Sequence, residues 1–121
     1  VNIEALTCVD MALHQILPAA MAYTKALCDG AIVKKQLDIT PKAELKLVDT
    51  LSAATDSVYE ISQSLKKALE TVPENRVEAV AYYHDVIVAQ MESLRKNADI
   101  LEQLTDKKYW PYPTYSDLLF Y

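Results

Sequence analysis

The chain has 121 residues, of which 51% are apolar and 24% are charged, and it carries a net charge of -5. This length and composition are typical of one globular domain with a single hydrophobic core. The excess of acidic residues argues against nucleic acid as a partner, because phosphate backbones are bound by clustered Lys and Arg side chains.

Signals for export or for a membrane are missing from the sequence pattern. No apolar run reaches the roughly 18 residues that a membrane-spanning helix requires, and the N-terminus lacks the pattern of a signal peptide. The two cysteines, Cys8 and Cys28, are too few for a disulfide scaffold. We therefore predict a cytoplasmic protein without a membrane partner. Because the chain begins at Val1 with a helical pattern, we also expect it to be a fragment of a longer protein.

The first predicted element is a helix over residues 1–29. A single glycine in the whole chain favours helices, since strands and tight turns consume glycine. Pro18 interrupts the helical pattern, so we expect a kink near residues 14–18, and Gly30 is the predicted C-cap. The apolar face repeats at alternating spacings of three and four residues: Leu6, Val9, Leu13, Ile16, Ala20, Tyr23 and Leu27.

The second predicted helix covers residues 41–71. Thr40 followed by Pro41 indicates its start, as a hydroxyl N-cap before a proline in the first helical position. Val72 and Pro73 end it. Its inward face is Leu45, Val48, Leu51, Thr55, Val58, Ser62, Leu65 and Leu69.

The third predicted helix covers residues 74–107 and has the most regular heptad pattern. Three long helices with short connectors predict an all-α fold, an antiparallel up-down bundle in which the first helix is kinked at Pro18. Residues 1–121 then form one domain. The heptad positions of the third helix are Val77, Val80, His84, Ile87, Met91, Leu94, Ala98, Leu101 and Thr105.

Aromatic residues are concentrated in the last segment, residues 109–121, which holds the only Trp and the only Phe. Its prolines favour an extended strap, residues 109–113, and the Thr114-x-x-Asp117 capping box predicts a short terminal helix. Burying each large side chain is worth roughly 1.5–3 kcal/mol, so we expect the segment to cover the bundle or a neighbour. The predicted structural or interface residues are Trp110, Pro111, Pro113, Tyr115, Leu118, Leu119, Phe120, and, on the first helix, His14, Pro18 and Tyr23.

Reactive side chains are sparse. His84 lies on the predicted seam of the third helix, where a phosphotransfer bundle would carry its reactive histidine, but it has no partner defined by spacing and is better explained by packing. His14 follows Asp10 by four residues, yet no Glu-x-x-His pair of a metal bundle occurs. We expect Cys8 and Cys28 to be small buried side chains. The pattern predicts no catalytic, cofactor-binding or metal-binding residue.

Two motifs resemble a known family. Residues 110–120 match Trp-Pro-x-Pro-x-Tyr-x-x-Leu-Leu-Phe, and residues 14–23 match His-x-x-x-Pro-x-x-x-x-Tyr. Both patterns are similar to the C-terminal helical domain of type III glutamine synthetases, the large-subunit bacterial class. An acidic run at residues 99–102, shortly before the tail, also fits that domain.

The resemblance implies a role in nitrogen metabolism. The parent enzyme would be a ligase that joins ammonia to glutamate with ATP and Mg or Mn, through residues of an upstream catalytic domain. This fragment would be inactive alone, hold no cofactor, and serve structure or oligomerisation. Its partners would be that catalytic domain and neighbouring subunits of a homo-oligomer. Two alternatives remain open: a free-standing helical adaptor that binds proteins through its aromatic tail, and a phosphotransfer bundle that uses His84.

Overall fold

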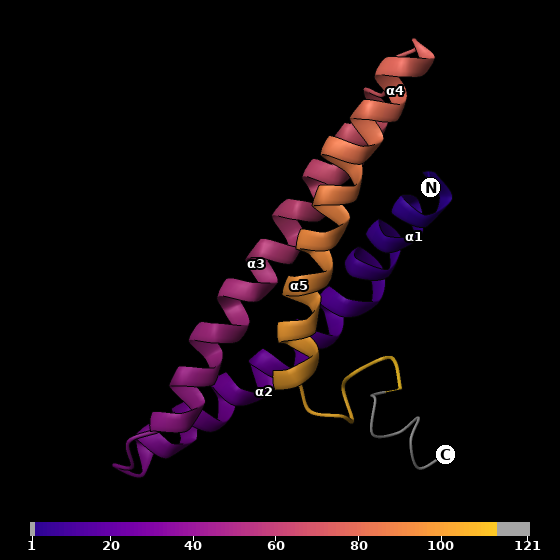
Figure 1. Ribbon diagram of the computed structural model, residues 1–121. Helices are drawn as coiled ribbons and strands as arrows, with labels where there is room; N and C mark the ends of the chain where they lie inside the picture. Colours follow the sequence, from indigo (N-terminus) through magenta and orange to yellow (C-terminus); the bar gives the residue numbers. More distant parts are fainter. Residues whose placement is uncertain (1, 114–121) are drawn as a thin grey trace.

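The structure, a computed structural model, describes residues 2–113, and within this range it is helical and contains no β-strand. The predicted all-helical class is therefore confirmed for the described part. Three helical segments follow one another along the chain (Figure 1): α1 (Asn2–Met11), the π-helix η1 (Ala12–Ile16) and α2 (Leu17–Gln36); α3 (Lys42–Glu70); and α4 (Arg76–Tyr82), the π-helix η2 (Tyr83–Ile87) and α5 (Val88–Leu104).

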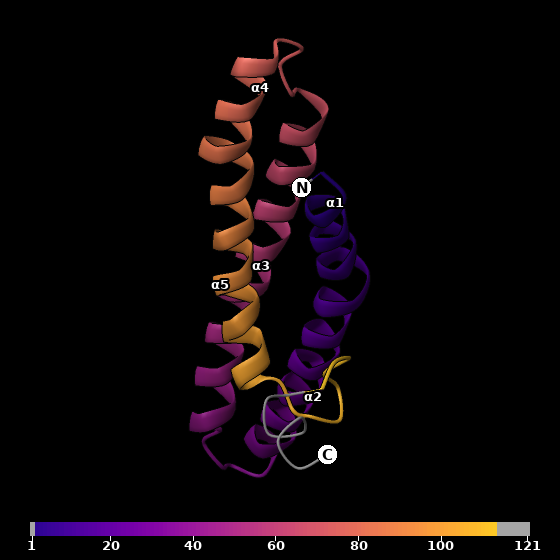
Figure 2. The ribbon, with the colours of Figure 1, turned by 45° about the vertical axis from the view of Figure 1, so that its right-hand side comes forward.

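Helix α3 is the central element, because it packs against α2 and α5 and also contacts α1. Figures 1 and 2 show each segment running back along the preceding one, with α4 and the end of α3 extending beyond the N-terminus of α1. Among the described residues, that end of the molecule is formed by α4 and the end of α3. Side chains from all three segments form one core, whose fully buried large members are Leu51, Val58, Leu65, Ile87 and Leu101.

The first segment continues past Gly30, so the predicted end at residue 29 is wrong. Helix α2 ends at Gln36, and Asp38 takes the left-handed conformation with φ 60°. Two backbone bonds close this end: the Ile39 N–H donates to Lys34 O at 2.8 Å, and the Asp38 N–H donates to Lys35 O at 3.1 Å. These are the two bonds of a Schellman motif, in which Asp38 occupies the place that glycine usually takes.

The irregularity expected at Pro18 takes the form of a π-helical turn. Proline has no N–H to donate, and η1 lies directly on its N-terminal side. The Leu17 N–H donates to Ala12 O, five residues back, so the helix continues without a break. The axis of the first segment bends in this region (Figure 2).

The start of α3 differs from the prediction by one residue. The helix begins at Lys42, and Pro41 is its N-cap, with no side-chain capping bond and with its ring fully buried. The predicted capping role of Thr40 is therefore wrong. An ion pair from Lys34 of α2 to Glu44 of α3 spans the connector, and its hydrogen bond lowers the pKa of Glu44.

The third segment keeps its predicted face only in its second half. Ile87, Met91, Leu94, Leu101 and Thr105 are buried. The earlier heptad positions are exposed: 79% for Val77, 67% for Val80 and, for its side chain, 85% for His84.

The π-helix η2 explains the loss of register in α4. A π turn holds one residue more than an α turn, so the residues before it are rotated relative to those after it. Tyr82 turns inward instead, and its hydroxyl donates to Ala68 O at 2.8 Å near the end of α3. The prediction that the apolar face of the third segment continues through His84 into α4 is thus wrong.

The first helical segment is longer and more apolar than the sequence pattern predicted. Residues Ile3–Gln36 form a helix that is long enough to cross a membrane. The mean hydropathy of its most apolar window is 1.3, so the helix is also apolar enough by composition alone. The expectation that no such stretch exists is wrong, because the helix runs on through Pro18 and Gly30. Core helices of soluble proteins satisfy the same criterion, and 33% of this window is buried inside the protein.

Candidate functional site: the strap on the first helix

The turn after α5 directs the aromatic residues toward the first segment. Thr105 is buried and extended, with φ -79° and ψ 132°, and ends the helix. The Asp106 carboxylate accepts a bond from the Lys108 N–H at 2.9 Å, and Asp106 O accepts bonds from the N–H groups of Tyr109 and Trp110. Asp106 thereby folds a compact turn, a common role for a short acidic side chain.

Aromatic contacts then fasten the strap. The ring of Tyr109 lies 5.5 Å from that of Tyr23 on α2, at an interplanar angle of 45°. Trp110 is only 9% exposed and belongs to the core, and Tyr112 meets it edge-on at 6.2 Å. Both separations fall in the range where aromatic pairs add to the energy of burial.

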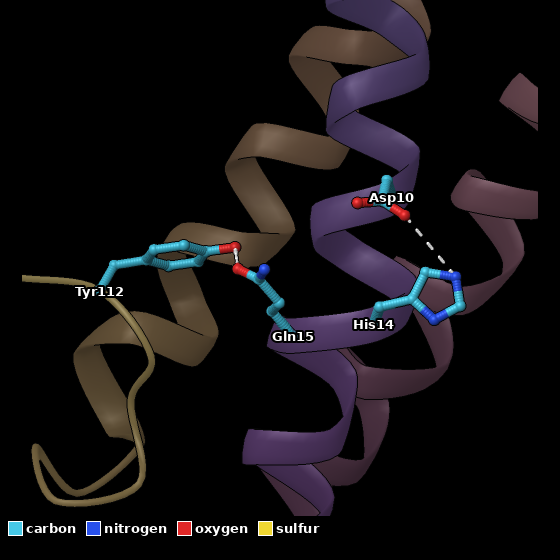
Figure 3. Close-up of polar contacts among 4 residues, drawn as sticks. All are labelled: Asp10, His14, Gln15 and Tyr112. Atoms are coloured by element: carbon cyan, nitrogen blue, oxygen red, sulfur yellow. Dashed lines mark hydrogen bonds and ion pairs between the residues drawn. The ribbon is translucent and has the colours of Figure 1, made fainter.

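A polar contact joins the far end of the strap to the π turn. The Tyr112 hydroxyl donates to Gln15 Oε1 on η1 (Figure 3). Burial, and secondly the charge of Asp10, raise the pKa of Tyr112, so the neutral donor form is favoured. On the same turn the exposed His14 ring lies 3.7 Å from Asp10 and points away from Tyr112 (Figure 3).

The structure brings together only some of the predicted interface residues. Trp110 packs into the core and Tyr23 packs against Tyr109, and neither lies in a cluster of reactive side chains. His14, Pro18, Pro111 and Pro113 are exposed. The predicted terminal helix and its residues lie outside the described range: Tyr115, Leu118, Leu119 and Phe120.

Two contact residues were not predicted from the sequence. Gln15 receives the hydroxyl of Tyr112, and Asp106 folds the turn. Asp106 had a local signal, because an Asp just after a helix is a frequent turn residue. No local sequence signal identified Gln15, since its partner is 97 positions away in the chain.

The other candidate side chains do not form a reactive cluster. His84 is exposed, as phosphotransfer requires, but its ring lies 3.0 Å from the Asp85 carboxylate, which would repel a phosphoryl group. Cys8 and Cys28 are both free and partly buried. Within residues 2–113, no group of three His, Cys, Asp or Glu side chains is placed to hold a metal ion. The contacts that the strap makes within the described residues are aromatic packing and one side-chain hydrogen bond to Gln15.

Comparison with known proteins gives a consistent set of relatives, although no protein-family model matches the chain. A glutamine synthetase of Butyrivibrio fibrisolvens is 32% identical over 125 residues, and one of Bacteroides fragilis is 26% identical over 128 residues. A type-3 glutamine synthetase of Dictyostelium discoideum is 23% identical over 128 residues. Each match covers 99% of this chain.

The matches cover a small part of each relative. The chain spans 18% of the length of the first two relatives and 17% of the third. The resemblance to glutamine synthetases that the two sequence motifs indicated is confirmed. The coverage is consistent with a C-terminal fragment of a type III protein.

Proposed function

We propose that the chain is the non-catalytic C-terminal structural domain of a type III glutamine synthetase, because it is similar along nearly its whole length to glutamine synthetases, one of which is a type-3 glutamine synthetase. In this proposal the parent protein forms glutamine from glutamate and ammonia. ATP and Mg or Mn would be bound by its upstream catalytic domain, and this domain would hold no cofactor. The domain would support folding or oligomerisation of a cytoplasmic enzyme.

The burial of Trp110 is the observation that carries the proposal. This side chain lies six residues after the end of α5, outside any described helix, yet it is 9% exposed and packed into the core. Tyr109 and Tyr112 reach residues of α2 and η1 on either side of it. We infer that the aromatic motif, which resembles the C-terminal pattern of this family, closes a three-segment bundle and thereby fixes the end of the third segment.

The partners follow from the proposed place in the parent protein. The relatives are more than five times as long as the segment that they share with this chain, since 18% of their length is covered. A domain of this kind would pack against the catalytic part of its own subunit and against neighbouring subunits of a homo-oligomer. The bundle would act as a rigid spacer at those contacts.

Removal of the domain from the parent protein tests the proposal. The parent truncated before Val1 and the intact parent would be compared by sedimentation velocity and by glutamine formation from glutamate, ammonia and ATP. We expect the truncated protein to form smaller or aggregated species and the isolated 121-residue chain to form no glutamine. Unchanged assembly of the truncated protein, or glutamine formation by the isolated chain, would overturn the proposal.

A further inference from the structure

An open apolar groove of about 570 Å³ runs between α2 and α3. Met21 and Cys28 line it from α2, and Thr55 and Tyr59 line it from α3. Met21 is 58% exposed and Tyr59 is 53% exposed, so both walls leave large apolar side chains in water. Clustered exposed apolar residues of this kind mark surfaces that bind a partner.

The strap does not cover this groove. Met21, Lys25 and Cys28 recur at helical spacing and share one face of α2. Tyr23, which contacts the strap through Tyr109, follows Met21 by two residues and so projects from nearly the opposite face. Helix α2 is thus covered by the strap on one side and open on the other.

We propose that the groove is the docking site for an amphipathic helix from the rest of the parent polypeptide. This inference rests on the proposed function and assigns one surface of the domain to the contact with the parent. The relatives supply the occupant, because more than four-fifths of their length lies outside the matched segment. The apolar face of such a helix would enter the groove between Met21 and Tyr59, as in other helix-in-groove complexes.

The charges that line the groove constrain the occupant. Asp56 and Lys25 both line the groove, and Lys25 is already paired with Asp29 at 3.0 Å. The occupant should therefore present a Lys or Arg toward Asp56.

The openness of the groove also disfavours a small ligand. Pockets for small molecules bury most of the ligand surface and are enclosed on several sides. Here the groove has two helical walls, and residues in both walls are more than half exposed. This shape suits a helix lying along α2 and α3.

Site-specific crosslinking in the intact parent protein tests the proposal. Benzoylphenylalanine would replace Tyr59 in one variant and, in a control, Val80 of α4, which is also more than half exposed. After irradiation, crosslinked peptides would be identified by mass spectrometry. We expect position 59, and not position 80, to crosslink to a peptide from outside residues 1–121. Crosslinks confined to residues 1–121, whether within a chain or between copies, or no crosslink at position 59, would overturn the groove assignment.

A charge substitution gives a second readout. Met21→Asp places a carboxylate in the groove at an exposed position, and Val80→Asp is its control on α4. We expect Met21→Asp to reproduce the assembly defect of the truncated parent and Val80→Asp to sediment as the intact protein does. If truncation disrupts assembly while Met21→Asp has no effect, the groove assignment fails and the proposed structural role stands. If truncation has no effect, the structural role itself fails.

Discussion

Helices α4 and α5 belong to one continuous segment with one apolar repeat, yet they meet the rest of the molecule differently. In α5 the repeat is buried, as Leu94 and Leu101 show with exposures of 4% and 0%. In α4 the same repeat places Val77 and Val80 in water. Between them lies η2, whose additional residue changes the register.

This difference shows which features of the fold the spacing of side chains can predict and which depend on the backbone conformation. The spacing of apolar residues predicts which residues of a regular helix share a face, and it does so correctly along α5. Spacing cannot reveal where the backbone takes up an extra residue. The third segment also extends past the N-terminus of α1, where α3 is the described helix that lies alongside it (Figures 1 and 2).

The largest expected effect is a difference in stability between two single-residue deletions, one inside the π turn and one outside it. Deletion of His84 should turn η2 into a regular α-helical turn while leaving Tyr82 and Ile87 facing inward, because the turn already holds one residue too many. We expect a melting temperature close to that of the original chain, measured by circular dichroism.

The matched control is the deletion of Glu92, an exposed residue in the regular part of α5. This deletion rotates one half of the helix by about 100° relative to the other, which exposes buried residues such as Leu94. We expect the control to be unfolded at room temperature. Equal loss of structure in both variants would show that η2 does not absorb an additional residue.

A second prediction tests the well-covered end of the third segment. Trp110→Ala removes a core side chain and should lower the free energy of unfolding by about 3–5 kcal/mol. Val77→Ala, at the exposed end of the same segment, should change it by less than about 0.5 kcal/mol. Urea denaturation measures both values. A small loss for Trp110→Ala would mean that the strap contributes little to the core.

Much of the fold could be predicted from the sequence, and the errors have physical causes. The pattern located three helical segments and most of the inward faces of α3 and α5, because apolar spacing determines those faces in a regular helix. Two further residues predicted to face inward are nevertheless exposed: Leu45 of α3 at 42% and Leu6 of α1 at 50%. It placed the end of the first helix at Gly30, since glycine is the usual C-cap, whereas Asp38 supplies the left-handed residue. Within the site, the burial of Trp110 followed from its size. The bond from Tyr112 to Gln15 joins residues far apart in sequence, and no local signal indicates it.

The third prediction concerns the polar contact at the end of the strap. Tyr112→Phe removes the hydrogen bond to Gln15 and should lower the free energy of unfolding by about 0.5–1.5 kcal/mol. Thermal denaturation at neutral pH measures this loss. Gln15→Leu, which removes the acceptor, should produce a loss of similar size, and combining both changes should add little further.

The pH dependence of the same contact has a defined sign. The pKa of Tyr112 is raised in the folded protein, so its contribution is complete below the tyrosine pKa of about 10 and is lost as the pH rises through the folded value. Trp110 is the only Trp, and its emission therefore reports release of the strap directly. We expect a red shift above about pH 10 that is smaller in Tyr112→Phe. The same shift in both proteins would contradict a role for this hydroxyl.

The smallest expected effect distinguishes the two possible ends of the first segment. Gly30 lies inside α2, and a Cβ atom at this position meets nothing within 4 Å. Gly30→Ala should therefore raise the free energy of unfolding by about 0.5–1 kcal/mol, because alanine favours the helix. Asp38→Ala should lower it, because alanine is disfavoured at φ 60°. If the helix instead ended at Gly30 with a left-handed residue there, as the sequence pattern predicted, the alanine at position 30 would be the destabilising one. The signs of the two changes, measured by urea denaturation of both variants, therefore decide where the backbone turns.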